Sequence, residues 1–192
     1  RSSDLYYPGE VNLRLADVVV LNKIDTADRA GIEAELEAVR SVNPDAQVIM
    51  AASPVTVDDP AAVKGKRVLV VEDGPTLTHG EMKYGAGTVA ARQLGAGEFI
   101  DPRPFAAGEI KATFEKYPGV GTLLPAMGYS DEQLKDLEAT INASGAELVV
   151  IGTPMDLRRI IDIKLPAVQV GYDVQEIGSP TLEDVLRERG FI

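Results

Sequence analysis

The sequence has 192 residues, of which 45% are hydrophobic, 26% charged and 5% aromatic, a composition typical of globular proteins and not of disordered or fibrous ones. The formal net charge of -11 argues against a sequence-independent grip on nucleic acid or on anionic lipid. Because there is no cysteine and one histidine, we expect no disulfide, no thiolate metal site and no histidine-rich zinc site. No run of about 18 apolar residues is present, so we expect a cytoplasmic protein with no membrane or nucleic-acid partner.

Short runs of aliphatic and β-branched residues alternate with helical patterns along the chain. The runs predicted as strands are 17–21, 46–50, 67–71, 98–100, 121–124, 147–151 and 167–170, and the predicted helices are 29–42, 87–94, 108–116, 130–143, 156–161 and 181–189. Nearly continuous apolar strands are typical of parallel sheets that are covered on both faces. We therefore predict an α/β fold of three layers, a mainly parallel sheet with helices on both faces, of the P-loop NTPase or Rossmann kind.

The stretch 53–66 interrupts this alternation. It contains Pro54, Asp58, Asp59, Pro60 and Gly65, which are typical of loops, and it is predicted as a linker or long connection. It divides the chain into two predicted domains, residues 1–62 and residues 63–192.

The tetrapeptide Asn-Lys-Ile-Asp at 22–25 directly follows the first predicted strand. In guanine-nucleotide-binding P-loop proteins this pattern reads the base, because the carboxylate accepts hydrogen bonds from two guanine nitrogens while the lysine stem covers the ring. The second strand ends in Ala-Ala-Ser at 51–53, where such proteins place a loop against the base. The predicted nucleotide-binding residues are Asn22, Lys23, Asp25, Ala52 and Ser53. The alternative is a polar strand-to-helix turn.

The sequence contains no Gly-x-x-x-x-Gly-Lys-Ser/Thr motif. Without it, the chain has no cradle for the β- and γ-phosphates and no hydroxyl ligand for Mg²⁺. We therefore expect the phosphate-binding half on an upstream P-loop segment or chain, and ATP or GTP with Mg²⁺ to bind in the intact protein, with this chain inactive by itself. A degenerate relic is the alternative.

A loop rich in glycine, threonine and carboxylates joins the strand 67–71 to the helix predicted at 87–94. Backbone donors of such loops, and the amino end of the following helix, bind anions. The predicted substrate- or anion-binding residues are Asp73, Gly74, Thr76, Thr78, Gly80, Gly85, Gly87 and Thr88, and His79 and Lys83 are predicted catalytic groups. A dinucleotide site on residues 85–90 with Asp101, and a purely structural loop, are the alternatives.

Arg158 and Arg159 follow the strand 147–151 and form an adjacent basic pair in an acidic chain. We predict that they gather a phosphate and take part in catalysis. The alternative is a solvated helix surface that is capped by Asp156. Loops at 102–104 and 125–129 also follow predicted strands, so several loops should meet at the sheet edge where open α/β sheets bind ligands.

The combination of these motifs resembles the carboxyl-terminal part of the cyclic 2,3-diphosphoglycerate synthetase family. The segments that carry the resemblance are 7–10, 12–14, 22–25, 71–80, 84–88 and 151–159, and it extends over essentially the whole chain. It implies a ligase that uses ATP and Mg²⁺ to close 2,3-diphosphoglycerate, a small phosphorylated acid, into a cyclic phosphoanhydride. It also implies an amino-terminal α/β domain and a P-loop upstream. The base-reading motif predicts guanine where the family implies ATP, and both remain open.

Two other classes of function fit the motifs. One is a GTP-binding regulatory, assembly or metal-delivery protein, which would be expected to carry clusters of metal-binding histidine or cysteine that this sequence lacks. The other is a non-catalytic module that binds a phosphorylated ligand and needs no P-loop. A homodimer is compatible with any of these functions.

Overall fold

The computed structural model describes residues 7–74 and 84–192 and divides the chain into two compact units. Unit 1 consists of Arg1–Pro54 and Tyr172–Ile192, and unit 2 consists of Val55–Gly171. Unit 2 is therefore inserted into unit 1 along the chain. The predicted boundary at 62/63 lies within the first elements of unit 2, and the return of the last residues to unit 1 is not predicted from the sequence.

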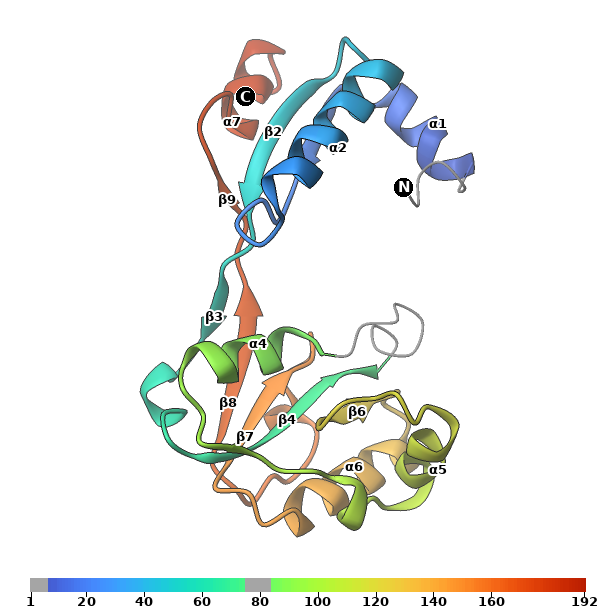
Figure 1. Ribbon diagram of the computed structural model, residues 1–192, viewed down its shortest axis with the longest axis vertical. Helices are drawn as coiled ribbons and strands as arrows, with labels where there is room; N and C mark the ends of the chain where they lie inside the picture. Colours follow the sequence, from blue (N-terminus) through green and yellow to red (C-terminus); the bar gives the residue numbers. More distant parts are fainter. Residues whose placement is uncertain (1–6, 75–83) are drawn as a thin grey trace. The chain divides into compact units, whose positions relative to one another are not determined.

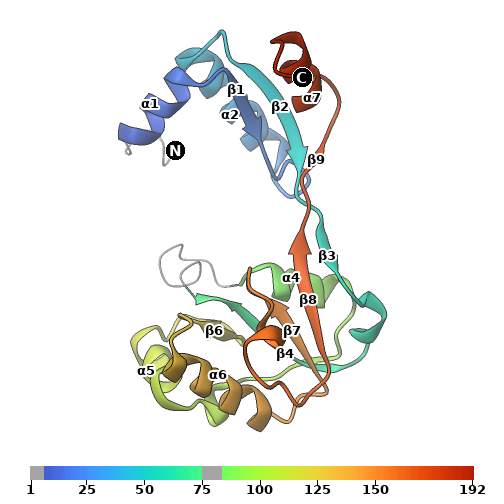
Figure 2. The same ribbon diagram turned by 180° about the vertical axis from the view of Figure 1, so that it is seen from behind.

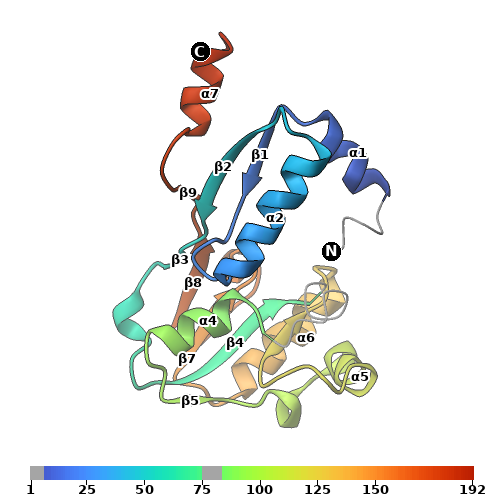
Figure 3. The ribbon, with the colours of Figure 1, turned by 45° about the horizontal axis from the view of Figure 1, so that its top comes forward.

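Unit 1 has a sheet of three strands in the order β1-β2-β9. Its elements are α1 (Tyr7–Leu15), β1 (Val18–Leu21), α2 (Arg29–Val42), β2 (Gln47–Ala52), β9 (Gln175–Glu176) and α7 (Leu182–Glu188). β1 runs parallel to β2 and β9 runs antiparallel to it, and α2 lies over the β1–β2 pair (Figure 3). The buried hydrophobic residues of this unit are few: Val39, Ile49, Ala51, Ala52 and Val185.

Unit 2 has a larger, mainly parallel sheet with the strand order β3-β8-β7-β4-β5, and β6 also pairs with β4. The strands are β3 (Val55–Val57), β4 (Arg67–Asp73), β5 (Glu98–Phe99), β6 (Leu124–Ala126), β7 (Leu148–Gly152) and β8 (Ala167–Tyr172). The helices are α4 (Ala86–Gln93) on one face, and α5 (Gly108–Lys116) and α6 (Asp131–Ala143) on the other (Figures 1 and 2). This arrangement confirms the predicted fold class.

The central strand β4 is the point at which the direction of winding changes. The chain passes from β4 to β5 and β6 on one side of it, and then returns to pair β7 with its other side. Open α/β sheets bind ligands at the carboxyl ends of the strands where the winding changes, which here are β4 and β7. Val68–Val71 and Leu148–Ile151 in these two strands are almost wholly buried.

Some predicted elements differ from those observed. The strand predicted at 121–124 is β6 at Leu124–Ala126, and 156–161 forms only the single 3-10 turn Leu157–Arg159. That turn ends because the following backbone bonds to α6 instead, with Asp162 N donating to Glu138 and Lys164 N donating to Asn142. The predicted linker contains β3, a 3-10 turn at Pro60–Ala62 and the fully buried Val63. In the part of the chain that the structure describes, no helix has the length and apolarity needed to span a membrane.

Candidate functional site

The base-reading motif predicted in unit 1 is assembled by hydrogen bonds between the ends of β1 and β2. Asn22 Nδ2 donates to Ser53 Oγ over 3.0 Å, and Ser53 N donates to Asp25 Oδ1 over 3.2 Å. Ile24 N donates to Ala51 O over 3.1 Å, which ties the first loop to the end of β2. The structure therefore brings together the carboxylate, amide and hydroxyl that the sequence motif predicts.

The backbone of this loop is held in a conformation that aims the Asp25 carboxylate. Lys23 has a φ of 62°, the left-handed region that non-glycine residues rarely adopt. Its amide donates to Asn22 Oδ1 over 2.8 Å, which supports the turn. Asp25 Oδ2 has no hydrogen-bond partner among the described residues, and the side chain is exposed. A carboxylate fixed by one oxygen and open at the other can accept from a base with paired N–H donors.

In unit 2, the Glu72 carboxylate lies at the amino end of α4. The side chain is 1% exposed. Its Oε1 accepts from Gly85 N at 3.1 Å, from Thr88 N at 2.7 Å and from Thr88 Oγ1 at 2.8 Å, and its Oε2 accepts from Gly87 N at 3.3 Å. Burial raises the pKa of Glu72, although the hydrogen bonds from Thr88, Gly87 and Gly85 act in the opposite direction. The protein thus holds an internal anion where a helix amino end binds anions in other proteins.

Glycines surround this carboxylate because side chains would not fit. A Cβ on Gly85 would lie 2.5 Å from Glu72 Oε2, and one on Gly152 would lie 2.5 Å from the same oxygen and 2.8 Å from Gly87 N. A Cβ on Gly87 would lie 2.9 Å from Val70 Cγ1. The glycine-rich sequence therefore has a close-packing role around Glu72.

These contacts bear on the predicted substrate site. The donors of Gly85, Gly87 and Thr88, predicted to bind a substrate anion, are already bound to Glu72. An external anion would have to displace a buried carboxylate from them, so the geometry does not favour this part of the prediction. Glu72 is not among the site residues predicted from the sequence. A glutamate after Val-Leu-Val-Val is the signal for its burial.

Asp73 and Gly74 lie at the same carboxyl edge of the sheet, near Tyr129 and Thr153. A Cβ on Gly74 would lie 2.7 Å from Ala126 O, which shows how closely β4 and β6 approach here. Burial and the Asp73 charge raise the pKa of Tyr129, against the effect of the Thr153 side chain. This edge therefore carries a carboxylate and the Tyr129 hydroxyl, whereas Thr153 is buried and its hydroxyl donates to Met155 O over 2.7 Å. Thr76, Thr78, His79, Gly80 and Lys83 belong to the same predicted site but lie outside the described residues, so their roles stay predictions.

Arg158 and Arg159 do not form a cationic pair open to a ligand. Arg158 Nη1 donates to Asp58 Oδ2 at 2.7 Å, while its Nε and Nη2 donate to Asp156 at 2.9 and 3.0 Å. The two carboxylates raise the pKa of Arg158, and they neutralise its charge locally. Arg159 is largely exposed and lies 3.8 Å from Asp156. The geometry favours a structural role for Arg158, which connects the turn at 157–159 with the segment after β3.

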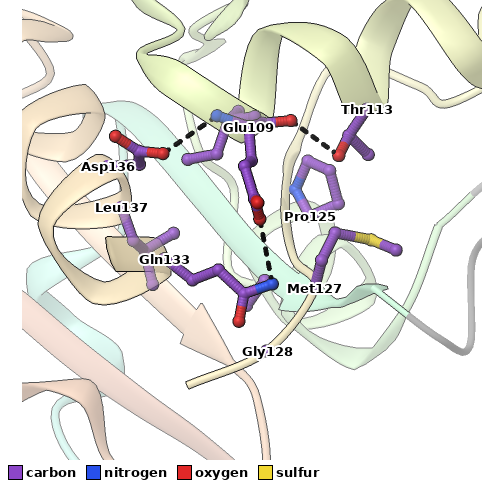
Figure 4. Close-up of a pocket in the computed structure, with 10 residues that line it drawn as sticks. Glu109, Thr113, Pro125, Met127, Gly128, Gln133, Asp136 and Leu137 are labelled. Carbon is purple, nitrogen blue, oxygen red and sulfur yellow. Dashed lines mark hydrogen bonds between the residues drawn. The ribbon is translucent and has the colours of Figure 1, made fainter. Parts of the chain in front are cut away.

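Among the cavities of unit 2, two that lie near predicted site residues differ greatly in size. One lies between α5, α6 and the end of β6, with Glu109 and Gln133 hydrogen-bonded across it at 3.2 Å (Figure 4). Its volume is about 20 Å³, which holds about one water and no metabolite. The other, lined by Tyr84, Thr88, Arg92, Phe99 and residues 121–123, has a volume of about 400 Å³. Within residues 7–74 and 84–192, no three metal-ligating side chains are grouped.

No family model matches the sequence. The chain is 58% identical over 183 residues to a protein of Thermococcus kodakarensis (strain ATCC BAA-918 / JCM 12380 / KOD1) named arginine synthetase ArcE. The match includes 95% of this chain and 41% of that relative, so the chain spans less than half of the relative's length. The relative is named as a synthetase, as the sequence resemblance implies, but not as a cyclic 2,3-diphosphoglycerate synthetase. This chain is therefore similar, over nearly all of its length, to one part of an archaeal synthetase.

Proposed function

We propose that this chain acts as part of a nucleotide-dependent synthetase, in which unit 1 binds the nucleotide base and unit 2 binds the acceptor. The identity of 58% over 183 residues to a protein named as a synthetase is the observation that carries the proposal. The hydrogen bonds that join Asn22, Asp25 and Ser53 support the base-binding part. The β- and γ-phosphates would be held by a P-loop on another segment or chain, because this sequence has none.

The residues of unit 1 fit a guanine base. Asp25 would accept from its paired N–H groups, Asn22 and Ser53 would hold the loops at the base edge, and the Lys23 stem would cover the ring. A bound nucleoside triphosphate would transfer its γ-phosphoryl group to an acceptor oxygen and leave as the diphosphate, and ammonia or an amine would then displace that oxygen as inorganic phosphate. The described residues include no group placed to hold Mg²⁺ or the triphosphate, so no step is assigned to them there.

The product that we propose is arginine, as in the name of the relative. The described carboxyl edge of unit 2 carries the negative charge of Asp73 beside Tyr129, and a negative charge favours an amine or a guanidinium over a doubly phosphorylated acid. Glu72 occupies the helix amino end, and Arg158 is paired with two carboxylates. 2,3-Diphosphoglycerate, the substrate that the sequence resemblance implies, is the second candidate, and His79 and Lys83 would be its cationic groups.

A chimera tests both candidates. This chain would replace the matching part of the Thermococcus kodakarensis relative, and the product would be assayed with ATP or GTP, Mg²⁺ and an ammonium salt as the nitrogen donor. We expect arginine formation from an acceptor that contains the arginine carbon skeleton, and no cyclic product from 2,3-diphosphoglycerate by phosphorus NMR. Cyclisation of 2,3-diphosphoglycerate without arginine formation would favour the second candidate over the first. A chimera that neither forms arginine nor cyclises the bisphosphate, beside an active parent, would contradict the synthetase proposal.

Asp25→Asn in the same chimera tests the choice of base. Replacing the carboxylate removes a charged acceptor, which costs about 1.5–3 kcal/mol per charge-assisted bond. If Asp25 reads guanine, the half-saturating GTP concentration should rise at least tenfold while ATP use changes little. Equal use of both nucleotides before and after the substitution would show that the tetrapeptide does not read the base.

A further inference from the structure

The cleft beside α4 is lined by Arg92, which has no ion pair with a carboxylate of the described residues. Arg92, in the last turn of α4, lies with its guanidinium carbon 5.1 Å from the centroid of the Tyr84 ring and 5.9 Å from that of Phe99. Arg40 and Arg92 are the arginines of the described ranges without a carboxylate at ion-pair distance; the others pair with Asp or Glu. Arg92 is exposed and lines the cleft, so its charge can be reached by a ligand.

The surroundings of Arg92 are those of a binding cleft. The cleft has a volume of about 400 Å³, which is within the range of metabolite sites. Leu123 and Phe99 supply apolar wall, and Gly121 and Thr122 supply backbone and hydroxyl groups, whereas the Thr88 amide and hydroxyl are already bound to Glu72. Among the described residues, none that lines the cleft is acidic. An anion in the cleft would therefore meet one positive charge and no carboxylate from these lining residues.

The two aromatic rings also restrict how Arg92 can interact. The Arg92 guanidinium lies over both rings, with its carbon 5.1 and 5.9 Å from their centroids, so that cation–π attraction holds the side chain. Its N–H groups point outward in the guanidinium plane, which is the geometry that receives a carboxylate or a phosphate through two parallel hydrogen bonds. The rings thereby orient the side chain before a ligand arrives, which reduces the entropy lost on binding.

We propose that this cleft binds the oxyanion group of a small organic acid, with Arg92 as the anchoring residue and Tyr84 and Phe99 as its supports. Carboxylate and phosphate share the required chemistry. The apolar wall at Leu123 and Phe99 favours a ligand that also has an aliphatic part. This inference deepens the proposed function, because it gives the acceptor of a synthetase a recognition group on unit 2, separate from the base site.

The test is ligand binding to the 192-residue chain, followed through its backbone amide NMR signals. The probes are L-arginine, agmatine, which is the same molecule without the carboxylate, and inorganic phosphate. We expect L-arginine or phosphate to shift the amides of Gly121, Thr122 and Leu123 saturably, with a dissociation constant of about 1 mM or tighter, and agmatine to leave them unchanged. Shifts with L-arginine assign a carboxylate ligand, and shifts with phosphate alone assign a phosphorylated one.

Two substitutions localise the binding. Arg92→Gln should raise the dissociation constant of the ligand at least tenfold. Arg40→Gln is the control, because Arg40 lies on α2 and is the other described arginine without an ion pair, and it should leave the dissociation constant unchanged. Arg92→Lys should restore part of the affinity, because it keeps the charge without the planar fork. Unchanged amide signals with all probes, equal responses to L-arginine and agmatine, or full binding by a folded Arg92→Gln variant would each overturn the proposal. Because no nucleotide is used, such a failure would leave the base site and the synthetase proposal standing.

Discussion

Glu72 supplies from within the protein the negative charge that helix amino ends elsewhere take from a bound phosphate. Gly85, Gly87 and Thr88 donate to it, and the carboxylate is almost wholly buried. Glu72→Gln would replace one of the two acceptor oxygens by an NH₂ group, which cannot accept from the N–H donors around it. We expect the free energy of unfolding at neutral pH to fall by about 1–3 kcal/mol, measured by urea denaturation.

The pH dependence of that difference is a separate prediction. Burial raises the pKa of Glu72 above 4.5, so the folded state binds this proton more tightly than the unfolded state. Its contribution to stability is therefore present below pH 4.5 and is lost as the pH rises through the folded pKa. The stability of the wild type relative to Glu72→Gln should decrease over that interval and be constant above it. A difference that grows with pH would show that the hydrogen bonds to the ionised form outweigh burial.

The ion pairs of Arg158 predict a pH dependence of stability opposite to that of Glu72, because they lower the pKa values of their carboxylates. Its hydrogen bonds lower the pKa of Asp156, and they help to lower that of Asp58 against the effect of burial. Arg158→Ala should reduce the free energy of unfolding by about 1 kcal/mol at pH 7, because the groups are partly exposed. The loss should shrink as the pH falls below 3.8 and the carboxylates protonate. Arg159→Ala is the matched control, and an equal loss in both variants would contradict the structural role of Arg158.

At the scale of elements, the contact between β4, β7 and the amino end of α4 leaves no space for a larger side chain. Gly152→Ala would bring a Cβ to 2.5 Å from Glu72 Oε2 and 2.8 Å from Gly87 N, so the helix end would have to move. We expect a loss of about 1–3 kcal/mol, as for other overpacked sites. Gly119→Ala, with nothing within 4 Å of the added carbon, should change stability by less than about 1 kcal/mol in either direction. Thermal denaturation of the two variants compares them directly.

The sequence allowed the longer elements to be predicted because their patterns are local. α2 and α5 occur at the predicted bounds, since a periodic apolar face and a cap or turn residue lie within each segment. β3 and β9 could not be predicted, because strands of two or three residues form only when a distant strand pairs with them. The hydrogen-bond partners of Arg158 and of the backbone donors at 85–88 could not be predicted either, because they are distant in the sequence. Asp58 lies 100 residues from Arg158, and no local spacing reveals that contact.

On the scale of the whole molecule, the two units differ in how much apolar surface they bury. Most of the buried hydrophobic residues of the described ranges belong to unit 2, whereas unit 1 buries few. We expect unit 1 to open first, so that amides of β1 and β2 exchange with deuterium orders of magnitude faster than those of β4 and β7. Mass spectrometry of exchanged peptides would measure this. Equal protection in all four strands would indicate a single cooperative unit.

Nucleotide binding by the isolated chain is also a property of the whole molecule. The base site without a phosphate cradle should give little affinity, because most contacts to a nucleoside triphosphate go to its phosphates. Isothermal titration of this chain with ATP or GTP and Mg²⁺ should detect no dissociation constant tighter than about 10 μM. Tighter binding would contradict the prediction that the triphosphate is held by another segment or chain, because it would require a phosphate site in this one.

The insertion of unit 2 within unit 1 has a consequence for biosynthesis. β2 pairs with β9, Val185 of α7 is buried, and Asp173 N donates to Pro54 O, so unit 1 is assembled from both ends of the chain. A ribosome that adds roughly 5–20 residues per second releases β1 and β2 on the order of ten seconds before their carboxyl-terminal partners. Unit 2 can fold during that delay, while the sheet of unit 1 lacks β9 and the apolar strand β1 stays in a partly formed sheet. The nascent chain should therefore depend on chaperones through its first unit and not through its larger one.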